Sequence, residues 1–292
     1  MRLRAMAKIN LGLDILKKRE DGYHEVRMIM QTIQMYDVLE IRKKAEPGIS
    51  LNVNFPFIPN DERNLVYKAA KLLMDEFEVA QGVEIQLDKF IPVAAGMAGG
   101  SSDAAAAFVG INRLFKLGLS EEELMERAVK IGADVPYCIM RGTALAEGIG
   151  EKLTRISQVP PCYVLIGKPA VNVSTKAAYE SLKLNEIDTH PDIDGMIQDI
   201  EKGDLYAMTS KMGNVFEKGI IEKYPVIQEI KDVMEEHGAL RAMMSGSGPT
   251  VFGIFDDKEK MEHAAAVLRE RKEAKTVFAT EIFNRSKGEK YE

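Results

Sequence analysis

The chain of 292 residues contains no tryptophan, two cysteines and four histidines, and it has no surplus of positive charge. Cys138 and Cys162 do not form a CxxC pair, which excludes a disulfide framework and a cysteine-based zinc site. The histidines lack the spacing of metal ligands, so we predict no structural metal site. The 16 methionines are scattered, which indicates core filler rather than a metal-binding tract.

The charge balance and the hydrophobic runs exclude further classes of protein. With 39 basic and 45 acidic residues the formal net charge is -6, so no global positive field attracts nucleic acid or anionic lipid. Charges interrupt every stretch long enough to span a membrane, and the initial MRLRAMAKIN lacks the apolar region of a signal peptide. We expect a cytoplasmic protein with no nucleic-acid or membrane partner. Any anionic ligand must be bound by a local group of residues, because the chain as a whole is acidic.

The length and the order of the elements predict two domains. At about 100 to 200 residues per domain, the chain is long enough for two hydrophobic cores. Strand and helix patterns do not alternate strictly, which favours an α+β fold over a doubly wound sheet. Pro160 and Pro161 mark the change between halves. We predict domains at residues 1–158 and 159–284 and a frayed tail at residues 285–292.

Hydrophobic periodicity predicts the individual elements. From Leu3 to Ile15 the odd positions are apolar and most even ones are polar, which indicates a half-buried strand. Lys8 and Asn10 project from its polar side, about 7 Å apart. Further strands are predicted at residues 23–33, 38–42, 83–88, 163–166, 240–244, 250–255 and 276–282. Helices are predicted at residues 64–77, 120–132, 226–238 and 257–271.

The most informative segment is PVAAGMAGGSSDAAAA at residues 92–107. Its glycines let the backbone approach a ligand, its serines and Asp103 suit a helix cap, and its alanines favour a helix. A glycine loop that leads into a helix N-terminus presents free N–H donors and the positive end of the helix dipole, so we predict a polyphosphate site. The spacings GxGxxG and GxxxxGK[ST] are absent, and GSSDA lacks the last glycine of a nucleophile elbow. The loop residues are Pro92, Val93, Ala94, Ala95, Gly96, Met97, Ala98, Gly99, Gly100, Ser101 and Ser102.

Three other features are ambiguous when each is taken alone. Lys8 and Asn10 fit a solvated strand face as well as a ligand site. Asp134 fits a simple turn former, in a bend where Pro136 moves Val135 out of the helical region. A late glycine loop fits a plain hairpin connection, and it consists of Ser245, Gly246, Ser247 and Gly248.

Taken together, these motifs resemble those of the GHMP small-molecule kinases. AKINLGL at residues 7–13, the segment at 92–106 and SGSGPT at 245–250 occur in the family's order across nearly the whole chain. The resemblance implies a kinase that uses ATP and Mg²⁺, with an N-terminal nucleotide-binding domain and a ferredoxin-like C-terminal domain. DGYHEV at residues 21–26 and GADVPY at 132–137 look like one group of the family, which phosphorylates the C2 hydroxyl of a cytidine diphosphate alcohol in non-mevalonate isoprenoid biosynthesis.

The resemblance also implies roles for single residues. Asp134 matches the general base, and Lys8 matches the lysine that pairs with this base and with the transferring phosphate. Asn64 is expected near adenine, and Ser102 is a candidate ligand of Mg²⁺. His24 is expected to hydrogen-bond cytosine, Tyr23 or Tyr179 to stack on it, and Thr175 to touch the diphosphate. The residues implied to contact the substrate are Asn10, Tyr23, His24, Thr175 and Tyr179.

Two alternatives and one departure remain open at this point. Another GHMP kinase, acting on homoserine, a mevalonate derivative or a sugar, would share the glycine loops, although DGYH argues against it. A non-catalytic nucleotide sensor on the same fold would not need Lys8 and Asp134. Ala98 stands where the family often has glycine, so a positive φ there requires a differently built loop. We expect attraction for ATP only at Lys8 and at the helix start, and the sequence leaves the oligomeric state open.

Overall fold

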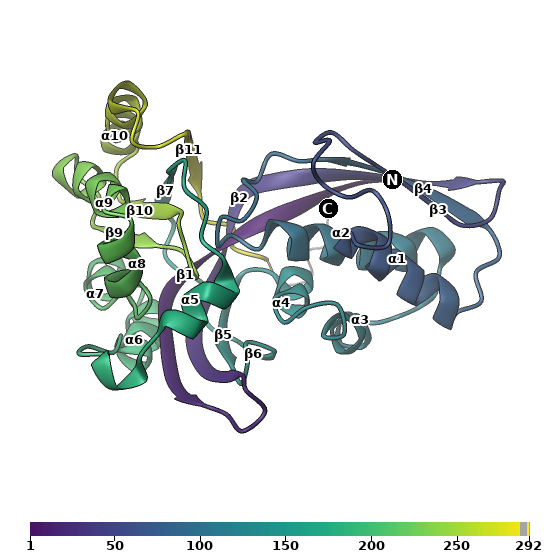
Figure 1. The fold of residues 1–292 in the computed structure, drawn as a ribbon, viewed down its shortest axis with the longest axis horizontal. Helices are drawn as coiled ribbons and strands as arrows, with labels where there is room; N and C mark the ends of the chain where they lie inside the picture. Colours follow the sequence, from purple (N-terminus) through teal and green to yellow (C-terminus); the bar gives the residue numbers. More distant parts are fainter. Residues whose placement is uncertain (287–290, 292) are drawn as a thin grey trace.

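The chain folds around two β-sheets with helices packed against both of them (Figure 1). The computed structural model describes residues 1–286 and 291, with the backbone alone for Ser181. The mixture of strands and helices confirms the predicted α+β class. Among the described residues, no helix is both long and apolar enough to cross a membrane.

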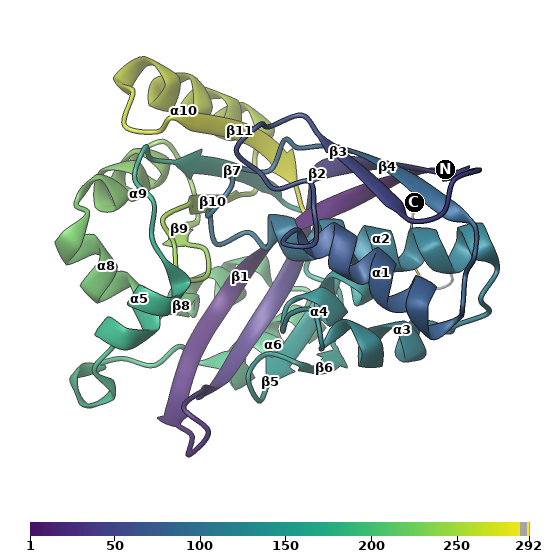
Figure 2. The same cartoon turned by 45° about the vertical axis from the view of Figure 1, so that its right-hand side comes forward.

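A long antiparallel hairpin forms the centre of the larger sheet (Figure 2). Its two strands pair from one end of β1 to the other with three register shifts, and the shorter strands attach to their outer sides. The order is β3 (Ile49–Val53), β4 (Gly82–Asp88), β2 (His24–Lys44), β1 (Arg2–Lys18) and β8 (Gly213–Asn214), while β5 (Thr143–Glu147) pairs with β2 and with β6 (Lys152–Arg155).

Strand β2 differs from the prediction of two separate strands at residues 23–33 and 38–42. The polar Gln34 and Asp37 interrupt the hydrophobic pattern between these ranges. The backbone nevertheless continues as a strand, because it pairs with β1 on both sides of a register shift at residues 33–35, with β5 at one end and with β4 at the other. Long-range pairing thus overrides the local signal for a break. Strands β3, β5, β6 and β8 were not predicted.

Strand β1 is buried on both faces, whereas the alternating pattern predicted burial of one. Its apolar Ala7, Ile9 and Leu11 belong to a core cluster shared with the smaller sheet. Lys8 and Asn10 on the other side are only 5% and 0% exposed. They are covered because the loop before α2 crosses them: the Lys8 N–H donates to the Met97 carbonyl over 3.2 Å.

Four helices of the first half lie on one side of the larger sheet (Figure 1). The capping box at Ser120 is confirmed, but its helix ends at Ala128, before the predicted residue 132. A turn does precede this helix, but Val135 is helical, so the prediction that Pro136 moves it out of the helical region is wrong. Pro136 instead occupies the first turn of a helix, where proline removes an N–H that has no partner within the helix. The helices are α1 (Leu65–Glu76), α2 (Gly99–Phe115), α3 (Glu121–Ala128) and α4 (Val135–Met140).

The second half contains a four-stranded antiparallel sheet with the predicted late hairpin at its edge. Its order is β11 (Thr276–Glu281), β7 (Tyr163–Lys168), β10 (Val251–Phe255) and β9 (Arg241–Met244). The helices are α5 (Thr175–Ser181), α6 (Ile193–Lys202), α7 (Leu205–Ser210), α8 (Glu217–Lys223), α9 (Val226–Glu236) and α10 (Lys258–Arg271), with a 3₁₀ turn at Leu184–Glu186.

The end of the chain returns to the first half. Arg285 forms an ion pair with Glu121, and Tyr291 is only 4% exposed beneath the guanidinium of Arg141. These residues are therefore packed, in contrast to the frayed tail expected at 285–292, of which residues 287–290 and 292 lie outside the described chain. Strand β8 also crosses back to pair with β1, so one cut after residue 158 does not separate all contacts of the halves.

Candidate active site

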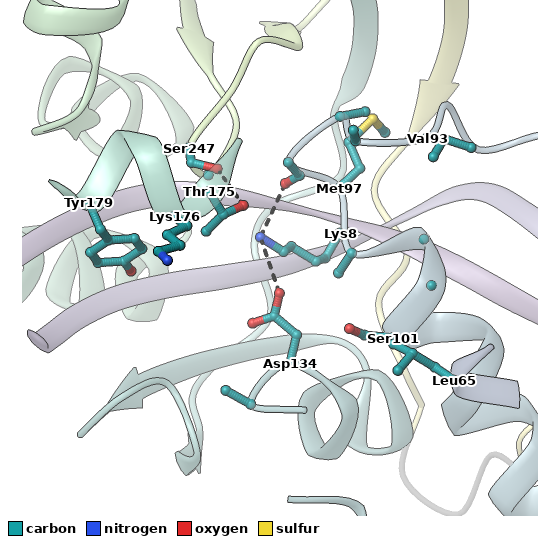
Figure 3. A pocket seen from close by; sticks show the side chains of 18 of the residues that line it. Lys8, Leu65, Val93, Met97, Ser101, Asp134, Thr175, Lys176, Tyr179 and Ser247 are labelled. Atoms are coloured by element: carbon teal, nitrogen blue, oxygen red, sulfur yellow. Dashed lines mark hydrogen bonds and ion pairs between the residues drawn. The ribbon is translucent and has the colours of Figure 1, made fainter. Parts of the chain in front are cut away.

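A cavity of about 1100 Å³ opens between the two halves and collects the predicted site residues (Figure 3). All of them line it except Ser102, Ser245 and Gly248. The walls come from β1, the loop before α2, the N-termini of α4 and α5, and the loop between β9 and β10. Segments far apart in the sequence therefore meet around one space.

The cavity is basic although the whole chain is acidic. Five basic side chains against three acidic ones leave a surplus of two positive charges in its lining. The expectation that attraction for ATP is confined to Lys8 and the helix start was therefore too narrow. The basic residues are Lys8, Lys18, Arg63, Lys89 and Lys176, and the acidic residues are Asp103, Asp134 and Glu180.

Lys8 and Asp134 face each other at the middle of the cavity (Figure 3). Lys8 Nζ lies 4.0 Å from Asp134 Oδ2, and it donates to Asn10 Oδ1 over 2.7 Å and to the Gly96 carbonyl over 3.2 Å. The Asp134 side chain is one-third exposed and makes no capping hydrogen bond to α4. The ammonium is thus fixed by its surroundings, while the carboxylate remains open to a ligand.

The glycine loop leads into α2 as predicted, but its serines do not cap the helix. Helix α2 begins at Gly99, and Ala98 precedes it with φ 55° and no side-chain capping bond. Ser101 and Asp103 therefore lie within the helix. The N–H groups of the first turn have no partner inside a helix, and here Gly99 and Ser101 line the cavity. This geometry suits an anionic ligand.

The two serines of the loop point in different directions. Ser102 is fully buried, and its hydroxyl donates to the Met6 carbonyl. Its oxygen is therefore turned away from the cavity, which removes the reason for choosing it as a Mg²⁺ ligand. The hydroxyl of Ser101 points into the cavity (Figure 3). Among residues 1–286 and 291, no group of three or more His, Cys, Asp or Glu side chains is arranged to hold a metal ion.

The conformation of Ala98 gives a stability test. A left-handed backbone costs an L-residue about 1–2 kcal/mol, and glycine would relieve this cost. Glycine also makes the unfolded chain more flexible, which offsets about 0.4–1 kcal/mol of that gain. We expect Ala98→Gly to raise the free energy of unfolding by about 0.5–1 kcal/mol in urea denaturation. Ala105→Gly, inside α2, is the control and should lower it by at least about 1 kcal/mol. Equal losses in both variants would contradict the strain at Ala98.

The late glycine loop packs against the phosphate loop, so it is more than a hairpin connection. Ser245 Oγ donates to the Gly96 carbonyl over 3.0 Å. Gly96 has φ +70°, and a Cβ there would lie 2.1 Å from the Ser245 carbonyl oxygen. The Asn214 side-chain amide also fixes this loop, because its Nδ2 donates hydrogen bonds of 2.8 Å to the carbonyls of Met244 and Gly246. The two glycine loops therefore form one packed unit.

The far end of the cavity is aromatic. The rings of His24 and Tyr179 lie 5.2 Å apart, and Tyr179 meets Phe216 edge-on at 4.8 Å. Thr175 Oγ1 lies 3.0 Å from Ser247 Oγ, while Tyr23 is 60% exposed at the rim. Burial, and secondarily the charge of Lys18, lowers the pKa of His24 below its ordinary value. A planar, uncharged ligand group fits this end.

At the opposite end, Asn64 shapes the wall by holding the start of α1. Its Oδ1 accepts from the N–H of Val66 over 2.9 Å, and its Nδ2 donates to the Pro59 carbonyl over 2.7 Å. Lys89 and Phe216 also line the cavity, and neither was predicted from the sequence. A signal existed for Lys89, since it is a charged residue between a predicted strand and the glycine loop. Phe216 has no comparable signal.

Two family models match the chain. The model described as GHMP kinases N terminal domain matches residues 64–142. The model described as GHMP kinases C terminal matches residues 196–274. The first range contains the phosphate loop and Asp134, and the second contains the late glycine loop.

Curated proteins and solved structures are similar over nearly the full length. A 4-diphosphocytidyl-2-C-methyl-D-erythritol kinase of Lachnospira eligens is 56% identical over 97% of this chain and 98% of its own length. A crystal structure of 4-(cytidine 5'-diphospho)-2C-methyl-D-erythritol kinase has a TM-score of 0.83 at 28% identity, covering 98% of this chain and all of the other. A homoserine kinase of Cytophaga hutchinsonii has a TM-score of 0.74 at 18% identity, covering 96% of this chain and 93% of the other, which shows the fold alone.

Proposed function

The chain belongs to the GHMP kinases, and among them to the 4-diphosphocytidyl-2-C-methyl-D-erythritol kinases; on this premise we propose that it transfers the terminal phosphoryl group of ATP to the C2 hydroxyl of that substrate. The reaction belongs to non-mevalonate isoprenoid biosynthesis. We assign the end of the cavity at the glycine loop to ATP and the aromatic end to the cytidine diphosphate alcohol. Lys8 and Asp134 lie between the two ends.

The position of the Lys8–Asp134 pair carries this assignment. It lies between the glycine loop on one side and Tyr179 on the other (Figure 3). A nucleotide with its phosphates on the α2 N-terminus and a cytosine beside Tyr179 would present their reacting groups to this pair. Phosphoryl transfer needs such alignment and charge neutralisation more than covalent participation.

We assign the following roles to the residues of the chain. The N–H groups at the start of α2 hold the phosphates, and the late glycine loop keeps Gly96 in place. Lys8 offsets negative charge on the transferring group and lies beside the Asp134 carboxylate. Asp134 accepts the proton of the substrate hydroxyl. We propose that ATP binds together with Mg²⁺, which would neutralise part of the phosphate charge. The Ser101 hydroxyl faces this region of the cavity and would be available to hold the ion.

We also propose a role for each half of the chain, the type of partner and the location in the cell. We assign ATP binding to residues 1–158 and closure of the substrate side to residues 159–284. A small molecule, rather than nucleic acid or a membrane, is the proposed partner. A cytoplasmic location fits the use of ATP and the two cysteines, Cys138 and Cys162, which remain free thiols.

His24 provides a pH-dependent test of the substrate end. Because its pKa lies below the ordinary value, the ring is uncharged at pH 7.5 and becomes charged only as the pH falls below about 6.5. We expect KM for the cytidine substrate to rise on this acid side, while KM for ATP stays constant. His24→Ala should raise substrate KM about 3- to 10-fold, the loss of one hydrogen bond, and should remove the acid rise. The same acid rise in the variant would contradict the role of His24.

A substrate panel tests the function as a whole. The purified protein with Mg-ATP is given 4-diphosphocytidyl-2-C-methyl-D-erythritol, mevalonate, phosphomevalonate or homoserine, and ADP release is measured. We expect release with the cytidine compound alone. Preference for homoserine or a mevalonate compound would identify another kinase of the family, and ATP binding without turnover on any compound would identify a sensor.

A further inference from the structure

A buried cluster of three charged side chains lies behind the phosphate loop, apart from the Lys8–Asp134 pair. The Lys89 ammonium donates to Asp37 and, over 2.6 Å, to Asp103. None of the three side chains is more than 4% exposed. Asp37 Oδ1 also accepts the backbone N–H groups of Phe90 and Ile91. The cluster thus combines side-chain ion pairs with backbone hydrogen bonds.

The cluster contacts both ends of the loop that is assigned to ATP. Phe90 and Ile91 lead directly into the loop, and Asp103 lies in α2 just after it. Asp37 comes from the middle of β2, which is anchored on both sides by β1 and β4. One group of ion pairs therefore ties the start and the end of the loop to the rigid part of the sheet.

The loop needs an external constraint. Both Ala94 and Ala98 have left-handed backbones, with φ of 52° and 55°. Such conformations persist in L-residues when the surroundings impose them. Gly99 packs directly on the cluster, since a Cβ there would lie 3.2 Å from Lys89 Nζ. The helix start that presents N–H donors to the cavity thus rests on the Lys89 ammonium.

Stability of the core alone does not account for this arrangement. Buried ion pairs lose hydration on burial and are often replaceable by apolar residues without loss of stability. One oxygen of Asp103 is buried without a hydrogen-bond partner, which adds to that cost. What such a cluster does supply is a fixed geometry, because a displaced charge would lose its partners.

We propose that Asp37, Lys89 and Asp103 are positioning residues that hold the phosphate loop in its ATP-binding conformation. The inference rests on the proposed kinase function and adds to it a set of residues for ATP affinity. Asp37 is the most suitable of the three residues to substitute, because its side chain does not line the cavity. An effect of Asp37 on ATP has to pass through the loop or through Lys89 and Asp103, and hydrogen exchange in the loop distinguishes the two routes.

The test compares Asp37→Asn with Asp199→Asn. Asp199 is a second buried aspartate that pairs with a lysine, Lys211, but it lies in α6, outside the cavity. We expect Asp37→Asn to raise KM for ATP and Kd for a non-hydrolysable ATP analogue at least tenfold, with substrate KM changed less than twofold. Hydrogen exchange in residues 92–98 should rise in the same variant. Asp199→Asn should lower Tm without these effects.

A second variant covers the case in which Asp37→Asn does not fold. Asp103→Asn is nearly isosteric and keeps an oxygen for Lys89, so we expect a folded protein with a three- to tenfold weaker analogue affinity. Unchanged affinity and loop exchange in the folded variants would overturn the proposal. Unfolding of both variants by circular dichroism would overturn it too, since the cluster would then serve the core. Analogue binding needs no turnover, so an inactive wild-type protein would refute the kinase function separately.

Discussion

Asp134→Asn is expected to lower kcat by about 10²- to 10⁴-fold while ATP binding remains near the wild-type value. The amide has nearly the same shape as the carboxylate, but it cannot accept the proton of the substrate hydroxyl. Because the Asp134 side chain makes no capping hydrogen bond, its replacement should leave α4 intact. The measurement is single-turnover phosphoryl transfer, together with titration of a non-hydrolysable ATP analogue.

Asp257→Asn is the matched control for this result. Asp257 also precedes a helix, α10, but it caps that helix and lies outside the cavity. The control should keep kcat within about twofold of wild type. A near-normal kcat in Asp134→Asn would exclude the role of this carboxylate as the base.

Lys8→Met is expected to lower kcat by about 10²- to 10³-fold, the usual cost of removing one group that stabilises developing charge. Lys8 is 5% exposed, and its ammonium is held by Asn10 and the Gly96 carbonyl, so there is little room for another cation to replace it. KM for ATP should also rise, because the same charge faces the phosphates. Steady-state kinetics at varied ATP concentration measures both effects.

Lys168→Met separates this effect from the loss of any buried lysine. Lys168 is 8% exposed in β7 and hydrogen-bonds to carbonyls of its own loop, away from the cavity. We expect this variant to have a lower Tm and an unchanged kcat. Equal losses of kcat in the two lysine variants would show that Lys8 acts through folding alone.

Features with local signals were predictable from the sequence. The phosphate loop combines glycines, serines and a run of alanines within 16 residues, and the structure places it before α2. The capping box at Ser120 and the late hairpin are likewise encoded by neighbouring residues. Only the helix boundaries moved, since Gly99 rather than a serine begins α2.

Features that depend on distant partners were not predictable. The alternation in β1 correctly separates its faces, but it does not show that a loop 88 residues away covers Lys8. Asp37 belongs to no motif, and its contact with Lys89 spans 52 residues. Pro136 is ambiguous in a different way, because proline disfavours helix before it and favours the first helical turn. Neighbouring residues alone do not decide between these two effects.

The most direct measurement of the central claim identifies the product. The protein is incubated with Mg-ATP and 4-diphosphocytidyl-2-C-methyl-D-erythritol, and the mixture is followed by ³¹P NMR. We expect a new phosphomonoester resonance on the methylerythritol, with its diphosphate intact and one ADP formed for each phosphomonoester. ADP formation without that resonance, or no reaction at all, would contradict the assignment of the cavity between Lys8 and Asp134 as the site of phosphoryl transfer.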